Sequence, residues 1–552
     1  MSEFHDYFSE KYERLKPTLR PIEELLGENE NYLLIAGDFF GIQKFIFEGL
    51  SSTNASKVLR AKSAYVQILV RLIAYRLCDI LGIEHRYILS SVAGKFEILS
   101  PVDDEKSLRE FRERLDDFFV DRFFGLSGIG LTWISCRAED FRDSARYRAL
   151  RDEMAKAVEA TKYHKFSMRE RNPVLSYDMS LDNASLCRIC NMRKITRDER
   201  CSLCDDFVKL GEHLTREDLI AFVREDASIE IFDGYGISFR EDHPYAMDIF
   251  DISKRRSDYY RHWPLSSYVY KESSGIADFK VLAQKASKDT SDGKRGIEAL
   301  AVLKADVDDM GRFIRESDVT DSYENFTLFS QGLDAFFSEE VPRIMKENYP
   351  HTYTVFAGGD DLFLIGAWSE IVDLARDIAD EFRSYVKERL TLSTGIILVK
   401  PSTPVSYLAQ RSEVALEASK ELDGKAAVTL FGETVKAVSY REYGKKLYSA
   451  LKSFETEVEA LPTAMLYRLL AFTQMSKRLR SRDENDLSHI EDAMWKSKLS
   501  YTFRRNLYEK TKDERKKARI DELLKQCDDI IDNHPREAKM ALSEFIYKRR
   551  KV

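Results

Sequence analysis

The sequence predicts an α+β fold with two ferredoxin-like domains, a four-cysteine insertion between them and a C-terminal helical domain. Two observations support this prediction. The order strand, helix, hairpin, helix, strand occurs twice along the chain, and the residues after 438 contain few glycines and prolines. A repeat of this length indicates two copies of one supersecondary unit. With 552 residues, the chain is also too long for a single hydrophobic core.

The two copies follow the split βαβ order that is found in palm domains. The first copy is expected at residues 32–36 (strand), 61–81 (helix), 87–90 and 96–99 (hairpin), 105–119 (helix) and 130–134 (strand). The second is expected at residues 299–304 (strand), 325–347 (helix), 353–356 and 362–365 (hairpin), 369–388 (helix) and 392–399 (strand).

These elements divide the chain into five segments. We expect a short lead-in at residues 1–30, a first, degenerate palm at 31–175, and a four-cysteine insertion at 176–240. A second, catalytic palm follows at 241–438, and a helical domain at 439–552. A polar stretch at residues 287–293 is expected to be a flexible loop.

The composition limits the classes of function. The formal net charge is -8, so the whole surface is not suited to nucleic acid, and any such contact must come from local basic clusters. The clearest clusters lie at residues 477–480, 515–519 and 548–551. No segment approaches the roughly 20 apolar residues that a membrane helix needs, and the N-terminus lacks the apolar core of a signal peptide. We therefore expect a cytoplasmic protein without a membrane partner.

The hairpin of the second copy carries adjacent acids. Gly358 and Gly359 form a turn between apolar strands, and Asp360 and Asp361 follow directly. Glycine suits a backbone with positive φ or a close approach to a ligand. Neighbouring carboxylates repel each other unless cations neutralise them. We therefore interpret this turn as a cation site, the alternative being acids that only cap a turn.

A second acidic site ends the first strand of the same copy, at Asp306 and Asp308. The first strand and the hairpin are neighbours in a split βαβ sheet, so Asp306 should face Asp360 or Asp361. Oxygen ligands of this kind suit Mg²⁺ or Mn²⁺. Two such ions about 4 Å apart can activate a hydroxyl and stabilise a leaving pyrophosphate. The pattern therefore indicates nucleotidyl transfer.

Two further features bear on this site. Lys420 and Lys425 lie near a helix end and could meet triphosphate oxygens, although lysines at a helix C-terminus are also common without a ligand. In the first copy, the turn reads Ala93-Gly94-Lys95 and lacks the acids. The first copy therefore either supplies half of a nucleotide pocket, with Lys95 facing phosphate, or serves only as a scaffold.

Four cysteines form two knuckles between the copies, Cys187-x-x-Cys190 and Cys201-x-x-Cys204. Four thiolates at this spacing give a closed, structural zinc site, because no position remains for water. The alternative is four unligated thiols. The other three cysteines are isolated and are expected to be ordinary thiols.

The acidic hairpin, the segments at residues 40–47 and 59–65, the cysteine insertion and the helical C-terminus together resemble a known family. This is CRISPR-associated protein 10, the large subunit of type III CRISPR effector complexes, and the Csm-type branch (type III-A) is the most similar. The resemblance implies cyclase-like palm domains that convert ATP into cyclic oligoadenylates when guide RNA pairs with target RNA. Guide RNA, target RNA and other Csm-type subunits would be its partners.

Carried over to this sequence, the resemblance assigns roles to individual residues. Asp306, Asp360 and Asp361 would be the catalytic and metal positions. The nucleotide-binding set would be Gly358, Gly359, Asp308, Lys420 and Lys425.

Many members of the family begin with an HD nuclease domain, whereas only about 30 residues precede the first palm here. We therefore expect no HD nuclease activity. Three alternatives to the oligoadenylate synthase remain open: a non-catalytic scaffold that binds nucleic acid, a synthase of a different adenylylated messenger, and a free-standing diguanylate-type cyclase.

Overall fold

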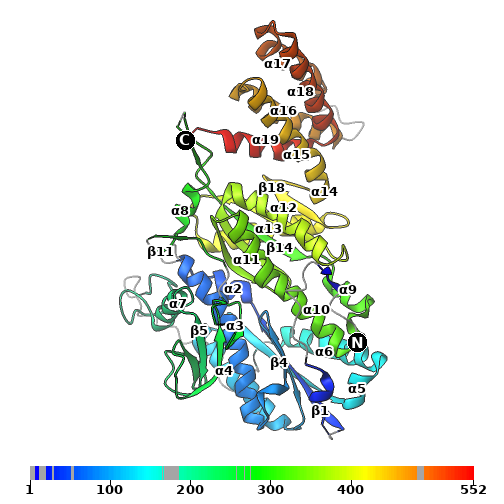
Figure 1. Ribbon diagram of the computed structural model, residues 1–552. Helices are drawn as coiled ribbons and strands as arrows, with labels where there is room; N and C mark the ends of the chain where they lie inside the picture. The colour runs from blue at the N-terminus through cyan, green and yellow to red at the C-terminus, as the bar shows by residue number, and fades with distance from the viewer. Residues whose placement is uncertain are drawn as a thin grey trace.

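The computed structural model describes residues 7–10, 20–27, 30–50, 55–164, 166, 186–256, 258–265, 268–273, 275–291, 293–481 and 490–551. Two sheet-containing domains lie against each other (Figure 1). The helical domain lies next to the second of them and forms the end of the molecule farthest from the first. The expected lead-in falls largely outside the described residues, apart from a short turn of helix at Ile22–Glu24. Among the described helices, none combines the length and apolar character of a membrane span.

The first sheet has four strands in the order β2-β3-β1-β4. Its strands are β1 (Asn31–Phe40), β2 (Ile88–Val92), β3 (Lys95–Ser100) and β4 (Gly128–Arg137), and its helices are α2 (Ile42–Phe47), α3 (Ala55–Leu81), α4 (Glu105–Phe123), α5 (Ala138–Arg142) and α6 (Ser144–Tyr163). Alternate side chains of β1 pack with α3 and α4 on one face and with α5 and α6 on the other. Helices on both faces explain why β1 is an almost continuous apolar run.

The second sheet has the order β15-β16-β14-β17-β18-β19. Its strands are β14 (Leu300–Val307), β15 (Thr352–Gly358), β16 (Asp361–Ala367), β17 (Leu392–Val399), β18 (Ala427–Leu430) and β19 (Glu433–Lys436). The first four positions repeat the order of the first sheet: hairpin, first strand, last strand. The predicted strand order of both copies is therefore confirmed.

The helices of this second domain are α9 (Met310–Glu316), α10 (Tyr323–Ala335), α11 (Val341–Asn348), α12 (Trp368–Tyr385) and α13 (Val405–Glu421). The single helix predicted at 325–347 is present but contains a π-helical segment at Phe336–Glu340 between α10 and α11. The helix α13 leads into β18, which pairs parallel to β17.

In the sequence, the segment between these two domains forms a third sheet, which the sequence analysis did not predict. The helix α7 (Ser202–His213) precedes five strands in the order β6-β7-β5-β8-β9. They are β5 (Leu219–Val223), β6 (Ile229–Phe232), β7 (Tyr235–Ser238), β8 (Ala246–Asp251) and β9 (Arg261–His262). The boundary predicted between residues 240 and 241 falls inside this sheet, because β8 pairs with β5.

Small elements lead from this sheet to the second domain. They are β10 (Lys271–Glu272), β11 (Gly275–Ile276), α8 (Phe279–Gln284), β12 (Lys288–Thr290) and β13 (Gly293–Arg295). The prediction of a flexible loop at residues 287–293 is wrong, since β12 and β13 pair as a hairpin.

The helical C-terminal domain has a hydrophobic core of its own. It consists of α14 (Ala437–Ser439), a π-helical segment at Tyr440–Gly444, α15 (Lys445–Glu457), α16 (Thr463–Arg480), α17 (Trp495–Asn506), α18 (Glu514–Asn533) and α19 (Pro535–Arg549). Buried acids join it to the second sheet domain. Glu433 of β19 pairs with Lys477 and Lys539 at 2.7 Å each. Lys548 pairs with both Glu544 at 2.8 Å and Asp373 of α12 at 2.9 Å.

These pairs change the interpretation of the basic clusters. Lys477 and Lys548 bind acids of the chain itself, Arg478 pairs with Asp492 at 2.6 Å, and Arg549 pairs with Glu455 at 3.0 Å. The clusters at 477–480 and 548–551 therefore serve the fold to a large extent, which leaves fewer charges for nucleic acid.

We predict that Glu544→Ala destabilises the helical domain by about 2–4 kcal/mol, because Lys445 and Lys548 lose their fully buried partner and keep only Asp373. The matched control is Glu522→Ala, which breaks an exposed pair with Arg519 and should cost less than about 1 kcal/mol. Denaturant unfolding of both variants measures the difference. Equal losses would show that the buried pairs do not hold the domain in place.

Candidate active site

The pairing of β14 with β16 brings two acids face to face. Asp306 at the end of β14 lies directly opposite Asp361 at the start of β16, with Asp360 next to it. Burial, together with the charges of Asp361 and Asp360, raises the pKa of Asp306 to about 7. Burial likewise raises the pKa of Asp361.

Two lysines stand beside this acid pair. Lys420 of α13 binds the Asp306 carboxylate, with 2.7 Å between Nζ and Oδ2, and this contact opposes the rise in the pKa of Asp306. Lys304 precedes Asp306 by two residues and points to the same face of the strand. It is only 3% exposed and pairs with Glu413 of α13. Sequence analysis missed Lys304, although a lysine two positions before the acid in an apolar strand was a usable signal.

The Gly358-Gly359 turn is built for close packing. Gly359 has a φ of +65°, and its N–H donates to Asp334 Oδ1 at 3.1 Å. A Cβ atom on Gly359 would lie 2.8 Å from Cβ of Ala93, in the corresponding turn of the first sheet. The turns of the two hairpins therefore touch, and this contact gives Gly359 a structural role in addition to the predicted approach to phosphate.

The structure does not bring Asp308 to this cluster. The Asp308 side chain is buried and accepts hydrogen bonds from Thr391 Oγ1 and Ser393 Oγ, both at 2.7 Å, and from the Ala426 N–H at 2.9 Å. These bonds involve both carboxylate oxygens, so Asp308 holds the loop before β18. Lys425 likewise lies outside the cluster, since it pairs with Asp309 at 2.8 Å.

A cleft of about 460 Å³ connects the acids to the first sheet domain. On the side of the second domain, it is lined by Lys304, Asp360 and Asp361. On the other side, it is lined by residues 38–44 at the end of β1 and by Lys95 and Lys162. Lys95 therefore lines the cleft between the two copies, which is the position that the first of the two alternatives for this copy requires.

A second cleft, of about 670 Å³, borders the same two turns. Its lining includes Val92 of the first hairpin and Asp334, the residue that receives the Gly359 N–H. Arg71 of α3 also lines it and lies 4.0 Å from the ring centre of Trp263. Burial raises the pKa of Asp334 to about 6, so this carboxyl is partly protonated near neutral pH.

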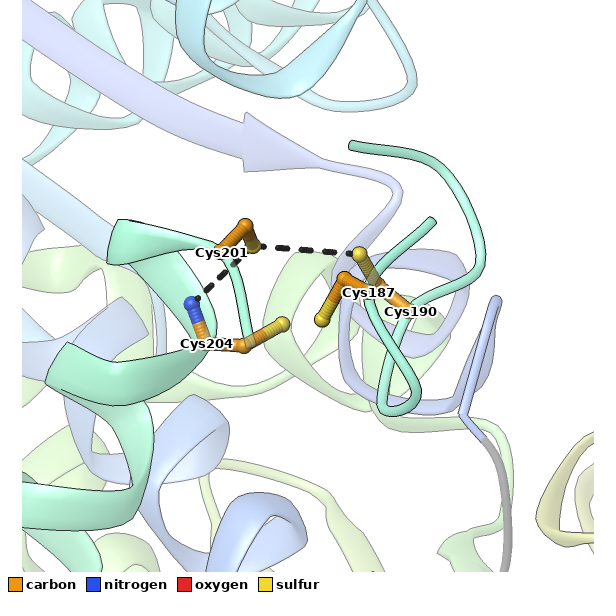
Figure 2. Close-up of side chains that lie close together, drawn as sticks. All are labelled: Cys187, Cys190, Cys201 and Cys204. Carbon is orange, nitrogen blue, oxygen red and sulfur yellow. Dashed lines mark hydrogen bonds between the residues drawn. The ribbon is translucent and has the colours of Figure 1, made fainter. Parts of the chain in front are cut away.

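The four predicted metal-binding cysteines do come together. The sulfur atoms of Cys187, Cys190, Cys201 and Cys204 all lie within 4.8 Å of one another. Figure 2 shows these side chains converging from a loop and from the start of α7. A tetrahedral zinc with Zn–S bonds of about 2.3 Å has sulfur–sulfur edges of about 3.8 Å, and the Cys190–Cys201 distance is 3.9 Å. The donor set therefore fits zinc.

The four thiols strongly influence one another. Hydrogen bonds among the sulfur atoms lower the pKa of Cys187 and Cys190 and raise the pKa of Cys201 and Cys204. Lys62 of α3 borders Cys190 and Cys204, and its ammonium can balance their negative charge. Burial lowers the pKa of Lys62 to about 8, against the attraction of these thiolates. The three isolated cysteines Cys78, Cys136 and Cys527 are buried core thiols.

Comparison with known proteins supports the resemblance. Two family models match: "Cas10/Cmr2, second palm domain" over residues 299–429 and "Csm1 subunit domain B" over residues 31–177. Curated relatives carry the name "CRISPR system single-strand-specific deoxyribonuclease Cas10/Csm1 (subtype III-A)". The protein of Streptococcus thermophilus is 23% identical, over 99% of this chain and 72% of the relative. That of Mycobacterium tuberculosis is 23% identical, over 75% of this chain and 56% of the relative.

The fold is also that of solved structures. The Csm1-Csm4 cassette in complex with cA3 has a TM-score of 0.69 at 20% identity, covering 95% of this chain and 70% of the other. The same cassette in complex with one ATP has a TM-score of 0.68 at 20% identity, with the same coverage. The chain spans between 56% and 72% of the length of the curated relatives. Residues 31–177 and 299–429 thus match family models of Csm1 and Cas10/Cmr2 domains, and the chain is similar to Cas10/Csm1 proteins of subtype III-A CRISPR systems.

Proposed function

We propose that this chain joins ATP molecules through 3′–5′ linkages into cyclic oligoadenylates, as part of an effector complex that pairs guide RNA with target RNA. The observation that carries this proposal is the position of Asp306 directly opposite Asp361, beside Asp360, next to a cleft that lysines line. Neighbouring structures of the Csm1-Csm4 cassette with cA3 and with one ATP support it.

The acid cluster fits divalent cations. Asp306, Asp360 and Asp361 would hold Mg²⁺ or Mn²⁺, which prefer carboxylate oxygens. The charges of Asp361 and Asp360 oppose ionisation of Asp306, and bound cations would relieve this repulsion. Bound there, two such ions would activate the attacking hydroxyl and neutralise the leaving pyrophosphate.

The side chains of the protein would do the remaining work. Lys420 keeps Asp306 oriented, and Lys95 and Lys162 offer positive charge to a triphosphate in the cleft. We propose that the first sheet domain is a degenerate palm, since it repeats the strand order of the second without the acids. Joining two nucleotides requires a donor and an acceptor, and the two clefts that border the touching turns offer room for both.

The partners follow from the family. We propose guide RNA, target RNA and other Csm-type subunits, among them a Csm4-type subunit as in the solved cassettes. The names of the relatives also describe a single-strand-specific deoxyribonuclease. The expectation that this chain lacks HD nuclease activity stays a prediction.

The decisive experiment incubates the assembled, target-bound complex with labelled ATP and identifies the products by mass spectrometry. We predict that the double variant Asp360→Ala/Asp361→Ala loses product formation by about a thousandfold or more, because the metal ligands are gone. The control is Asp309→Ala, which removes an exposed acid that pairs with Lys425 outside the cluster and should retain synthesis.

Synthesis that persists in the double variant would overturn the assignment of the site. A wild-type complex that binds target RNA but makes no product would favour the scaffold, and an adenylylated product other than an oligoadenylate ring would favour the alternative synthase.

The raised pKa of Asp306 has a consequence for stability. Between the unfolded value of 3.8 and the folded value of about 7, the folded protein binds more protons than the unfolded chain, so stability falls as pH rises through this window. Asp306→Asn removes this penalty. We predict that, without divalent cations, the variant melts at a higher temperature than wild type at pH 8, and that this gain is lost at pH 4.

With added Mn²⁺ at pH 8, wild type should instead melt at a higher temperature than the variant, because the ion stabilises only the protein that binds it. Thermal unfolding of both proteins with and without Mn²⁺ measures both effects. A Mn²⁺-induced rise in melting temperature of equal size in the variant would place the ion elsewhere.

For the cysteine cluster, we predict one zinc ion per chain in elemental analysis of the pure protein. Cys201→Ser should lower the zinc content and the melting temperature, because Cys201 both ligates and caps the start of α7. Cys78→Ala is the control, since Cys78 lies outside the cluster and its loss should leave zinc in place. Pure protein without zinc would contradict the assignment.

A further inference from the structure

The segment at residues 59–65 contributed to the family resemblance, but apart from Lys62 beside the cysteines it has no place in the sites described so far. It lies in α3, and its Arg60 is only 1% exposed. The Arg60 guanidinium donates in two directions. One nitrogen donates to the Gly211 carbonyl of α7 at 2.7 Å, and another donates to the Tyr353 hydroxyl of β15 at 3.0 Å. Arg60 therefore contacts both β15, the strand before the acidic turn, and the cysteine module, by which we mean the four cysteines together with α7.

The contact on the side of β15 is buried and specific. Tyr353 is 0% exposed, and its hydroxyl accepts from Arg60 while donating to the Ser56 carbonyl of α3. Tyr353 lies at the beginning of β15, which ends at Gly358 and pairs with the strand that starts at Asp361. A shift of β15 against α3 would therefore move the turn that carries the acids.

The contact on the other side depends on close backbone packing. A Cβ atom on Gly211 would lie 2.4 Å from the Lys57 carbonyl oxygen, so α7 rests directly on the backbone of α3. Cys201 and Cys204 sit at the N-terminus of the same helix. Ligation of the four sulfur atoms would fix this end of α7, and the rigid helix would carry the constraint to the Gly211 carbonyl near its other end.

The charge of Arg60 makes the two contacts interdependent. Within the described part of the chain, no carboxylate forms an ion pair with Arg60, so its buried charge relies on neutral acceptors. The hydrogen bonds of a buried guanidinium are charge-assisted, and leaving such a cation unsatisfied is costly. A planar guanidinium can also reach two acceptors at once, which a lysine ammonium on a flexible stem does less well. Loss of one acceptor should therefore disturb the other.

We propose that Arg60 is a positioning residue that ties the cysteine module to the acidic hairpin, so that loss of zinc loosens β15. Its effect on catalysis rests on the proposed function, whereas the mechanical link does not. The link can therefore be measured without any activity, by hydrogen exchange of the full-length chain.

The experiment follows amide exchange in β15 of wild type, Tyr353→Phe and Arg60→Leu, each before and after removal of zinc by a chelator. In wild type, removal of zinc should speed exchange in β15 by about tenfold or more, as expected for a lost charge-assisted hydrogen bond. Tyr353→Phe removes a single oxygen atom and should give a similar increase with zinc still bound.

Lys57→Ala is the matched control. It breaks the Lys57–Glu212 pair of 2.8 Å on the same α3–α7 face but does not touch the link to Tyr353, so exchange in β15 should stay at the wild-type rate. If Arg60→Leu does not fold, Tyr353→Phe alone carries the test.

Two outcomes would overturn the proposal. In the first, chelation speeds exchange only around residues 186–214 and leaves β15 unchanged. In the second, the effects of chelation and of Tyr353→Phe on β15 multiply, which would mean that they act by separate routes. If the link holds but the wild-type complex makes no oligoadenylate, then the proposed function fails and the positioning role stands.

Discussion

The antiparallel register of β14 and β16 places two carboxyl groups opposite each other in a partly buried position. Asp306 and Asp361 repel each other when both are ionised, and burial strengthens this repulsion because little solvent screens it. The surrounding cations follow from this constraint. Lys420 binds Asp306 directly, and Lys304 stands on the same strand face. Without divalent cations, burial and this repulsion together oppose ionisation, which is why the pKa of Asp306 is raised.

Because of the internal repeat, a second hairpin of the same kind lies against the hairpin that carries the acids. The two sheets share one strand order, and their hairpins meet turn to turn at Ala93 and Gly359. In the second sheet the turn carries acids, whereas in the first sheet Lys95 follows the turn. Two related domains thus face one cleft with opposite charge, an arrangement that suits a negatively charged ligand bridged by cations.

Buried charged groups also connect the parts of the molecule. Glu433 and Asp373 join the helical domain to the second sheet domain, and Arg60 joins the cysteine module to β15. Such contacts are demanding, because a charge taken out of water must keep all of its partners. Buried charged contacts therefore make the position of one domain depend on the position of its neighbour. This dependence is stronger than it would be across a purely apolar interface.

The sequence by itself determined the strand order of both copies, the position of the acids at strand ends, the four-cysteine cluster and the family resemblance. These features depend on local patterns: apolar runs, glycine turns and fixed cysteine spacing. The five-stranded sheet was missed because its strands are short, with two to six residues each, and too short a segment shows no clear period.

Only the tertiary structure decided which polar residues meet. It buried Asp308 under three hydrogen bonds, paired Lys425 with Asp309 and brought Lys304 beside the acids. It also joined Arg60 to Tyr353 across 293 positions of the chain. The physical reason is that a side-chain partner is chosen by distance in the folded protein, and distance between remote segments leaves no periodic trace in the sequence.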